Sequence, residues 1–215
     1  MESVYFCLDV GGTEIKAAPV SGRGSLLAPL RHFPARAKEP LDCLLAHFCE
    51  IFREIRIDPE DIPELRLAFP GPFDYENGIC LMQGLDKYDA LYGVNLKNEL
   101  SDRLQIPRQN IRFANDAAAF AMGEMAFGAA QNAARALFIC IGTGCGSTFG
   151  LNGMPAPFGT PGVPAGGYLY DAPFLDGCID DYLSRRGLMK LAREITGEAL
   201  DGKELAQEAE RGNPQ

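Results

Sequence analysis

Residues 4–20 read VYFCLDVGGTEIKAAPV. The β-favouring residues from Val4 to Val10 predict one strand, and Ile15 to Val20 predict a second strand after the Gly11-Gly12-Thr13 turn. Two strands joined by a Gly-Gly turn favour a β-hairpin. A P-loop or a Rossmann motif requires a helix after its glycines, so the pattern argues against both.

The glycines of this turn allow a sharp bend and a close approach of the backbone to a phosphate. We expect Gly11, Gly12 and Thr13 to bind a phosphate group, and Asp9 at the strand end to hold Mg²⁺ directly or through water. Lys16 ends the same motif and is a further candidate cofactor ligand. The alternative is a plain Gly-Gly hairpin in which Asp9 is only a turn residue.

A second glycine-rich turn, IGTGCGST, spans residues 141–148 and follows a predicted strand over 135–141. Gly142, Thr143, Gly144 and Gly146 are candidate phosphate ligands for the same reasons. Any tight turn, or a Rossmann loop, could carry this pattern alone. Apolar flanks on both sides favour a hairpin, and two such hairpins in one chain are more specific than either by itself.

Asn115-Asp116 lies between the two turns, after a predicted strand over 111–114 and before a predicted helix over 117–128. The common structural explanation of such a pair is N-capping of the helix. The functional alternative is a carboxylate, Asp116, that orients and deprotonates a sugar hydroxyl. Its position between two phosphate-type turns favours the functional interpretation.

Further elements follow from periodicity and breaker residues. The motif Pro70-Gly71-Pro72-Phe73-Asp74 follows a predicted buried strand over 65–69. It predicts either a wall of a substrate cleft, which would include Gly71, or a simple loop that ends the strand. Apolar residues at helical spacing predict helices over 40–55 and 95–104, and helical pattern resumes from 178 to 210. Residues 152–176 predict a long loop or lid.

Composition limits the classes of function. The 215 residues are 47% hydrophobic and 23% charged, as in an ordinary soluble globular protein, and the net charge of −9 argues against nucleic-acid binding. Neither a signal peptide nor a transmembrane stretch is recognisable, so we expect no membrane partner and a cytoplasmic location. The seven scattered cysteines favour buried reduced thiols over disulfides, and the two histidines make a zinc site improbable.

Taken together, the motifs resemble those of the ROK family (repressors, open reading frames and sugar kinases). Asp9-Val-Gly-Gly-Thr13 matches its first phosphate motif, Pro70-Gly-Pro-Phe-Asp74 its Pro-Gly-Pro-x-Asp turn, and Asn115-Asp116-Ala-Ala-Ala with Gly123-Glu124 its central helix. Gly142-Thr-Gly-Cys-Gly146 with Asn152-Gly153 matches the second phosphate motif. The match runs from about residue 4 to residue 187.

This resemblance implies an α/β actin-like ATPase fold of the ribonuclease H type, with lobes 1–112 and 113–215 around a cleft. It implies ATP, Mg²⁺ and a small-molecule sugar, a hexose or N-acyl hexosamine, and it implies a homodimer. Carried over, Asp116 would be the catalytic base, Asn115 a sugar-hydroxyl ligand, and the two glycine turns would hold the phosphates.

The chain departs from the family pattern in three respects. Glu14 stands where the family often has Lys, and the zinc signature is missing, so we expect no zinc. AGGYLY at 165–170 replaces a Gly-Glu-x-Gly-His segment, with Gly167 and Tyr170 in place of the sugar-contacting Glu and His. The family's glycine-rich adenosine-binding segment has no counterpart, which predicts an incomplete second lobe with exposed apolar surface.

Three functions therefore remain in consideration. The favoured one is an ATP-dependent, glucokinase-like carbohydrate kinase that transfers the γ-phosphate of MgATP to a sugar hydroxyl. A catalytically inactive sugar-binding or regulatory ROK protein is the main alternative. A ROK transcriptional regulator is less favoured, because such proteins carry a helix-turn-helix before the first strand and this sequence begins at that strand.

Overall fold

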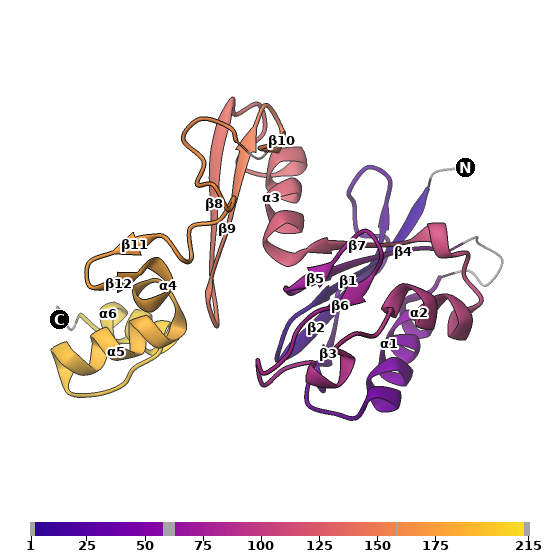
Figure 1. Cartoon of the computed structure of the whole chain (residues 1–215), viewed down its shortest axis with the longest axis horizontal. Coiled ribbons are helices and arrows are strands. Elements are labelled where there is room, and N and C mark those ends of the chain that lie inside the picture. Colours follow the sequence, from indigo (N-terminus) through magenta and orange to yellow (C-terminus); the bar gives the residue numbers. More distant parts are fainter. Residues whose placement is uncertain (1–2, 58–62, 158, 213–215) are drawn as a thin grey trace. The chain divides into compact units, whose positions relative to one another are not determined.

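The computed structural model describes residues 3–57, 63–157 and 159–212 (Figure 1). Internal contacts divide the chain into two compact units, one ending at Ala119 and the other beginning at Phe120. These units meet inside a helix, α3 (Asp116–Phe127), so its first residues belong to unit 1 and its later turns to unit 2. The two units are described in turn.

Unit 1 is built on a five-stranded sheet with the order β3-β2-β1-β4-β7. Strand β1 (Val4–Val10) pairs antiparallel with β2 (Glu14–Ser21), which pairs antiparallel with β3 (Arg31–Pro34). On its other side β1 pairs parallel with β4 (Glu64–Phe69), and β4 pairs parallel with β7 (Ile111–Asn115). The predicted hairpin of residues 4–20 is confirmed.

Alternating side chains of these strands build the core of unit 1. Phe6 and Leu8 of β1 and Leu65 and Leu67 of β4 are buried, in the alternation that a strand with one covered face requires. Helix α1 (Leu41–Ile55) contributes an apolar face to the same cluster, together with α2 (Leu96–Leu104). Both helices fall where the sequence predicts them.

Short elements complete unit 1 between β4 and β7. Strands β5 (Phe73–Asp74) and β6 (Ile79–Cys80) form a two-stranded ladder, and two 3-10 turns, η1 and η2, cover Asp89–Leu91 and Arg108–Asn110. The segment between β6 and η1 contains Asp86 and Tyr88, both with a left-handed backbone at φ of 57° and 56°. It therefore follows a sharply turned path, which positions side chains in the site described below.

Unit 2 contains a three-stranded sheet of order β10-β9-β8. Strand β8 (Arg135–Ile141) pairs antiparallel with β9 (Cys145–Leu151) along its whole length, and β10 (Met154–Pro155) pairs with the end of β9. The second predicted hairpin is thus also confirmed. The later elements are β11 (Pro173–Phe174), β12 (Gly177–Cys178), α4 (Ile179–Tyr182), α5 (Arg185–Thr196) and α6 (Gly202–Glu210).

The buried core of unit 2 is small. It consists of Ala121 and Met125 of α3 and Phe138 of β8, whereas Leu137, Ile139 and Ile141 of β8 remain exposed. Gly150 of β9 admits the Met125 side chain, since a Cβ there would lie 2.7 Å from the Met125 sulfur. Apolar side chains are exposed on β8 and also on helices, at Phe127 of α3 and at Leu191 and Ile195 of α5, in agreement with the predicted exposure of apolar surface.

Two smaller expectations meet the structure differently. The seven cysteines are free thiols, but Cys43 is exposed at the start of α1, so the expected burial is wrong for that residue. The helical phase places Cys43 on the outer face of α1, opposite the buried Leu44 and Phe48. No helix in the described ranges is both long and apolar enough to cross a membrane.

Candidate active site

Three predicted motifs meet at one edge of the sheet in unit 1. Strands β1, β4 and β7 run parallel, and their registers pair Asp9 with Ala68 and Phe69 with Asn115, so their carboxyl ends are aligned. The first glycine turn follows β1, Gly71 follows β4, and Asp116 follows β7. Ligands of open α/β sheets bind outside this edge.

Electrostatic coupling links Asp9 to the other charged groups at this edge. Partial burial raises the pKa of the Asp9 carboxyl, Lys16 opposes that rise, and the carboxylates of Asp116 and Glu14 add to it. Lys16 lies directly across the β1–β2 ladder from Asp9. Two acidic groups that repel each other at a strand end fit a divalent cation, because the cation would favour the ionised forms of both.

The first glycine turn has a backbone that requires glycine at its first position. The Gly11 N–H donates to the Glu14 carbonyl at 2.9 Å, and a Cβ on Gly11 would lie 2.7 Å from that oxygen. By contrast, Gly12 and Thr13 are exposed, and their N–H groups donate to no oxygen within the described part of the chain. These two N–H groups are thus available to an anion.

Tyr88 holds this turn in place through a hydrogen bond, a role that the sequence did not indicate. Its hydroxyl donates to the Gly11 carbonyl at 2.8 Å and its own N–H donates to the Ala37 carbonyl at 2.6 Å. The ring is fully buried and lies 5.3 Å from the Phe69 ring, centroid to centroid. Tyr88 is far from Gly11 in sequence and carries no motif, so no local pattern could have found it.

Of the two roles that the sequence left open for Asn115-Asp116, the structure shows the helix cap and leaves the carboxylate of Asp116 exposed. The Asn115 side-chain oxygen accepts the Ala118 N–H at 3.1 Å, so Asn115 caps helix α3. Its amide nitrogen donates to the Tyr75 hydroxyl at 3.1 Å, which in turn donates to the Phe69 carbonyl at 3.1 Å. Within the described part of the chain, the Asp116 carboxylate accepts only the Ala117 N–H, at 2.9 Å, and Asp116 is exposed at the sheet edge.

Gly71 leaves space for the same network. A Cβ on Gly71 would lie 3.2 Å from the Tyr75 hydroxyl oxygen, which is a tight contact. Tyr75, like Tyr88, was not singled out from the sequence. Its hydroxyl connects the end of β4 to the cap of α3, and it therefore fixes the start of the helix that carries Asp116.

The second glycine turn lies in unit 2 and already contacts a carboxylate. Cys145 N–H donates to Asp180 Oδ1 at 2.5 Å, and Arg186 donates to Asp180 Oδ2 at 2.7 Å. Of the predicted ligands, Gly142 donates its N–H to the Gly144 carbonyl at 2.9 Å, and Gly146 lies within β9 opposite Cys140. Only the Thr143 and Gly144 N–H groups therefore remain without a partner among the described residues.

Residues 165–170, which stand in place of the Gly-Glu-x-Gly-His segment of the family pattern, are held by two hydrogen bonds, one to Ser147 and one to Asp180. Leu169 N–H donates to the Ser147 hydroxyl at 2.8 Å, and the Asp180 N–H donates to the Tyr170 carbonyl at 2.9 Å. Gly167 has a φ of 77°, a left-handed conformation that a glutamate would adopt only with strain.

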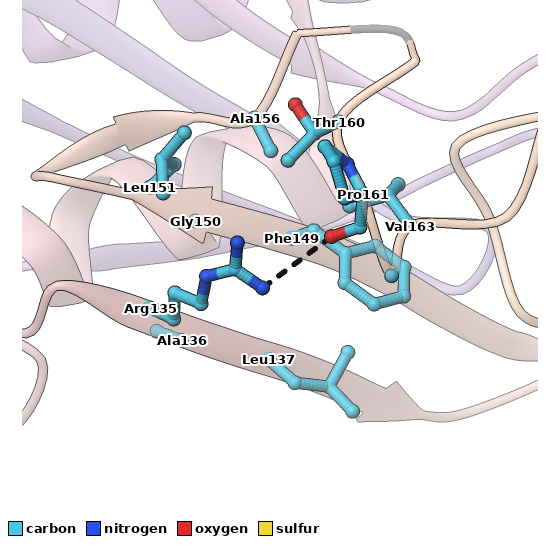
Figure 2. A pocket seen from close by; sticks show the side chains of 11 residues that line it. Arg135, Ala136, Leu137, Phe149, Gly150, Leu151, Ala156, Thr160, Pro161 and Val163 are labelled. Carbon is cyan, nitrogen blue, oxygen red and sulfur yellow. Dashed lines mark hydrogen bonds between the residues drawn. The ribbon is translucent and has the colours of Figure 1, made fainter.

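Unit 2 also contains a cavity of about 240 Å³, which Figure 2 shows from close by. Strands β8 and β9 form its floor, and the segment around Thr160–Val163 covers it, with the Arg135 guanidinium donating to the Pro161 carbonyl at 3.3 Å. None of the predicted phosphate-binding or catalytic residues lines this cavity. Its lining is mainly apolar and includes none of the residues of the two glycine turns.

Comparison with known proteins decides the family. The model of the ROK family matches residues 5–215. The chain belongs to the ROK family. That assignment confirms the resemblance drawn from the four motifs, and structural comparison extends it to the fold.

ROK relatives include sugar kinases of several kinds. The chain is 26% identical over 195 residues to a glucokinase of Thermotoga maritima, covering 87% of this chain and 59% of that protein. It is 24% identical over 213 residues to the N-acetylgalactosamine kinase AgaK of a Shewanella species, covering 92% of this chain and 66% of that protein. The chain thus spans less than two thirds of the length of these two relatives.

Solved structures confirm the actin-like ATPase fold. The ROK hexokinase from Thermus thermophilus superposes with a TM-score of 0.70 at 25% identity, covering 100% of this chain and 70% of that chain. A ROK glucokinase from Streptomyces griseus, solved in complex with glucose and AMPPNP, gives 0.72 at 21% identity, covering 99% and 72%. The α/β class and actin-like fold expected from the sequence are therefore confirmed.

Metal binding by the side chains alone would require several His, Cys, Asp or Glu residues to converge. In residues 3–57, 63–157 and 159–212, no three His, Cys, Asp or Glu side chains converge as a metal site would require. Cys178 instead contacts Asp181, with 3.2 Å between the sulfur and Oδ2. A magnesium ion bound mainly through phosphate oxygens and waters needs only one or two protein carboxylates, so the described side chains are compatible with Mg²⁺.

Proposed function

We propose that this ROK protein acts as an ATP-dependent sugar kinase that phosphorylates a hydroxyl of a hexose or N-acyl hexosamine. The observation that carries the proposal is the alignment of Asp9, the first glycine turn, Gly71 and Asp116 at one sheet edge. The sugar kinases among its relatives support the same reaction class. A cytoplasmic location is an expectation from the sequence pattern, and a homodimeric state is an expectation from the family resemblance.

In the proposed reaction each residue has one task. Asp116 accepts the proton of the sugar hydroxyl as the hydroxyl oxygen attacks the γ-phosphorus in line, and ADP leaves. The Gly12 and Thr13 N–H groups donate to phosphate oxygens. Mg²⁺, when bound at Asp9, would neutralise phosphate charge. Because phosphoryl transfer depends mainly on alignment and charge neutralisation, this small set of groups is sufficient.

Asp116→Asn tests the base directly. Asparagine can still accept the Ala117 N–H through its side-chain oxygen, so the start of α3 should stay folded. We expect kcat for ADP release to fall by at least about 100-fold, the usual contribution of a general base, with sugar binding largely retained. A coupled ADP-release assay over a panel of hexoses and hexosamines, with binding followed by thermal shift, gives both measurements.

Asp42→Asn is the matched control, because Asp42 is an exposed acid in the first turn of another helix, α1. Its turnover should equal that of the parent protein. If Asp116→Asn keeps parental turnover with its preferred sugar, Asp116 is not the base and the proposed mechanism fails.

A second candidate function is a sugar-binding protein without turnover. The observation in its favour is the left-handed Gly167 in the segment where the family pattern carries its sugar-contacting Glu. This candidate predicts a sugar-dependent thermal shift with no ADP release at any sugar in the panel, whereas the kinase predicts both.

A further inference from the structure

The first glycine turn has a second neighbour besides Tyr88. An ideal Cβ on Gly12 would lie 3.4 Å from Cδ of Lys87, so the aliphatic part of Lys87 packs directly over this turn. Lys87 is half-buried and precedes Tyr88 in the chain. A Cβ at Gly12 would be in van der Waals contact with Lys87, so the two residues are direct neighbours.

Three anchors hold the backbone that presents Lys87. On its C-terminal side Tyr88 is fixed by its bonds to Gly11 and Ala37 and by its buried ring. On its N-terminal side Asp86 pairs with Lys38, and the Leu85 N–H donates to Asp89 Oδ1 at 3.2 Å. Lys87 therefore projects from a fixed support, which lowers the entropy lost when its ammonium group binds a ligand.

The charges near the first glycine turn are mainly negative. Asp9, Glu14 and Asp116 are coupled there, and Lys16 is the cation that acts on Asp9. The Glu14 carboxylate pairs with His32 on β3, with 3.0 Å between Oε1 and Nδ1. Within the described residues, no carboxylate lies within ion-pair distance of Lys87, in contrast to Lys38 with its partner Asp86.

An anion that carries several charges needs a cation at such a turn, because its attraction to N–H groups alone is opposed by the nearby carboxylates. We infer that the Lys87 ammonium group binds the phosphate chain of the phosphoryl donor over Gly12. This inference rests on the proposed kinase function and adds the residue that makes a locally acidic turn receptive to a polyanion.

The test measures binding of inorganic tripolyphosphate, with and without Mg²⁺, to the full chain by isothermal titration calorimetry. Lys87→Met removes the charge and keeps the apolar stem. We expect its Kd for tripolyphosphate to rise about tenfold or more, as for loss of one charged hydrogen bond. Lys87→Arg should stay within about threefold of the parent, because the guanidinium also binds phosphate.

Lys97→Met is the matched control, since it removes an equal charge from unit 1 at a residue of α2 whose ammonium group donates to the Glu76 carbonyl and takes no part in holding Lys87. Its Kd should stay within about twofold of the parent. Parental binding by Lys87→Met overturns the inference, and so does equal weakening by Lys97→Met, which would indicate only a diffuse charge effect. A parent chain that does not bind tripolyphosphate also overturns it.

Turnover measured on the same samples separates this inference from the proposed function. If the parent binds tripolyphosphate through Lys87 but phosphorylates no sugar, the kinase proposal fails and the role of Lys87 stands. If the parent phosphorylates a sugar and Lys87→Met leaves the KM for ATP unchanged, the role of Lys87 fails and the kinase proposal stands.

Discussion

The Asp9 carboxyl, which we propose holds Mg²⁺, lowers the stability of the folded protein when it is ionised. Burial and the nearby carboxylates raise the pKa of its side chain, so the folded protein holds its neutral form more strongly than the unfolded chain does. The stabilisation from this group is complete below the ordinary pKa of aspartate. It is lost as the pH rises through the raised pKa of the folded state, so at neutral pH the ionised Asp9 destabilises unit 1.

Asp9→Asn should therefore raise the Tm of unit 1 at pH 7 by about 1–2 °C, a modest gain because solvent screens part of the repulsion. The gain should shrink as the pH falls through the raised pKa of Asp9. Differential scanning calorimetry between pH 3 and pH 8 gives the profile. A Tm difference that is independent of pH would contradict the argument.

Asp74→Asn is a control of opposite sign. Hydrogen bonds from Asn77 lower the pKa of the Asp74 carboxyl, so this group stabilises the fold above the ordinary pKa of aspartate. Its replacement should lower the Tm at pH 7, and the loss should vanish as the pH falls through the lowered pKa.

At the scale of elements, sequence patterns predicted most of what is local. Gly-Gly and Gly-Thr-Gly between β-favouring runs were sufficient for the two hairpins, and the spacing of apolar residues was sufficient for α1 and α2. The contacts that shape the candidate site are not local. Tyr88 meets Gly11 across 77 positions and Asp180 meets Cys145 across 35, and no periodicity encodes either pair.

The cap of α3 shows why two interpretations of one motif can both hold. Asn115 caps the helix, which leaves the exposed Asp116 free for chemistry. Asn115→Ala should lower the free energy of unfolding of unit 1 by about 1 kcal/mol, the usual value of an N-cap, and it should also remove the hydrogen bond that the Tyr75 hydroxyl accepts from Asn115. Urea titration followed by circular dichroism measures the loss.

Asn95→Ala gives the matched comparison, because Asn95 caps α2 through a bond of 3.0 Å from the Asn98 N–H. Both variants should lose similar stability, and only Asn115→Ala should also weaken sugar binding in the thermal-shift assay. Equal sugar binding by the two variants would indicate that the Asn115–Tyr75 contact is only structural.

At the scale of the whole molecule, the two units differ in how much apolar surface they bury. Aromatic residues such as Phe48, Phe69 and Tyr88 pack together inside unit 1, whereas the core of unit 2 is limited to the cluster around Met125 and Phe138. Folding stability follows buried apolar area. Unit 2 should therefore unfold first.

We expect two transitions in urea, with amide hydrogens of β8 and β9 exchanging at lower urea than those of β1 and β4. Met125→Ala should shift only the first transition, and Phe69→Ala only the second, each by about 2–5 kcal/mol for a buried large-to-small change. Hydrogen exchange with mass spectrometry resolves the two. A single cooperative transition in all three proteins would contradict the expectation.

Helix α3 carries the proposed base Asp116 at its start and two residues of the unit 2 core, Ala121 and Met125, in its later turns. Each residue of an α-helix advances the side-chain direction by about 100°, so Ala121 and Met125, four residues apart, share one face of the helix. A one-residue insertion between them would leave the capped end in place but turn the two side chains onto different faces. The number of residues between Ala121 and Met125 is therefore fixed by the core, even where single side chains of α3 can be exchanged.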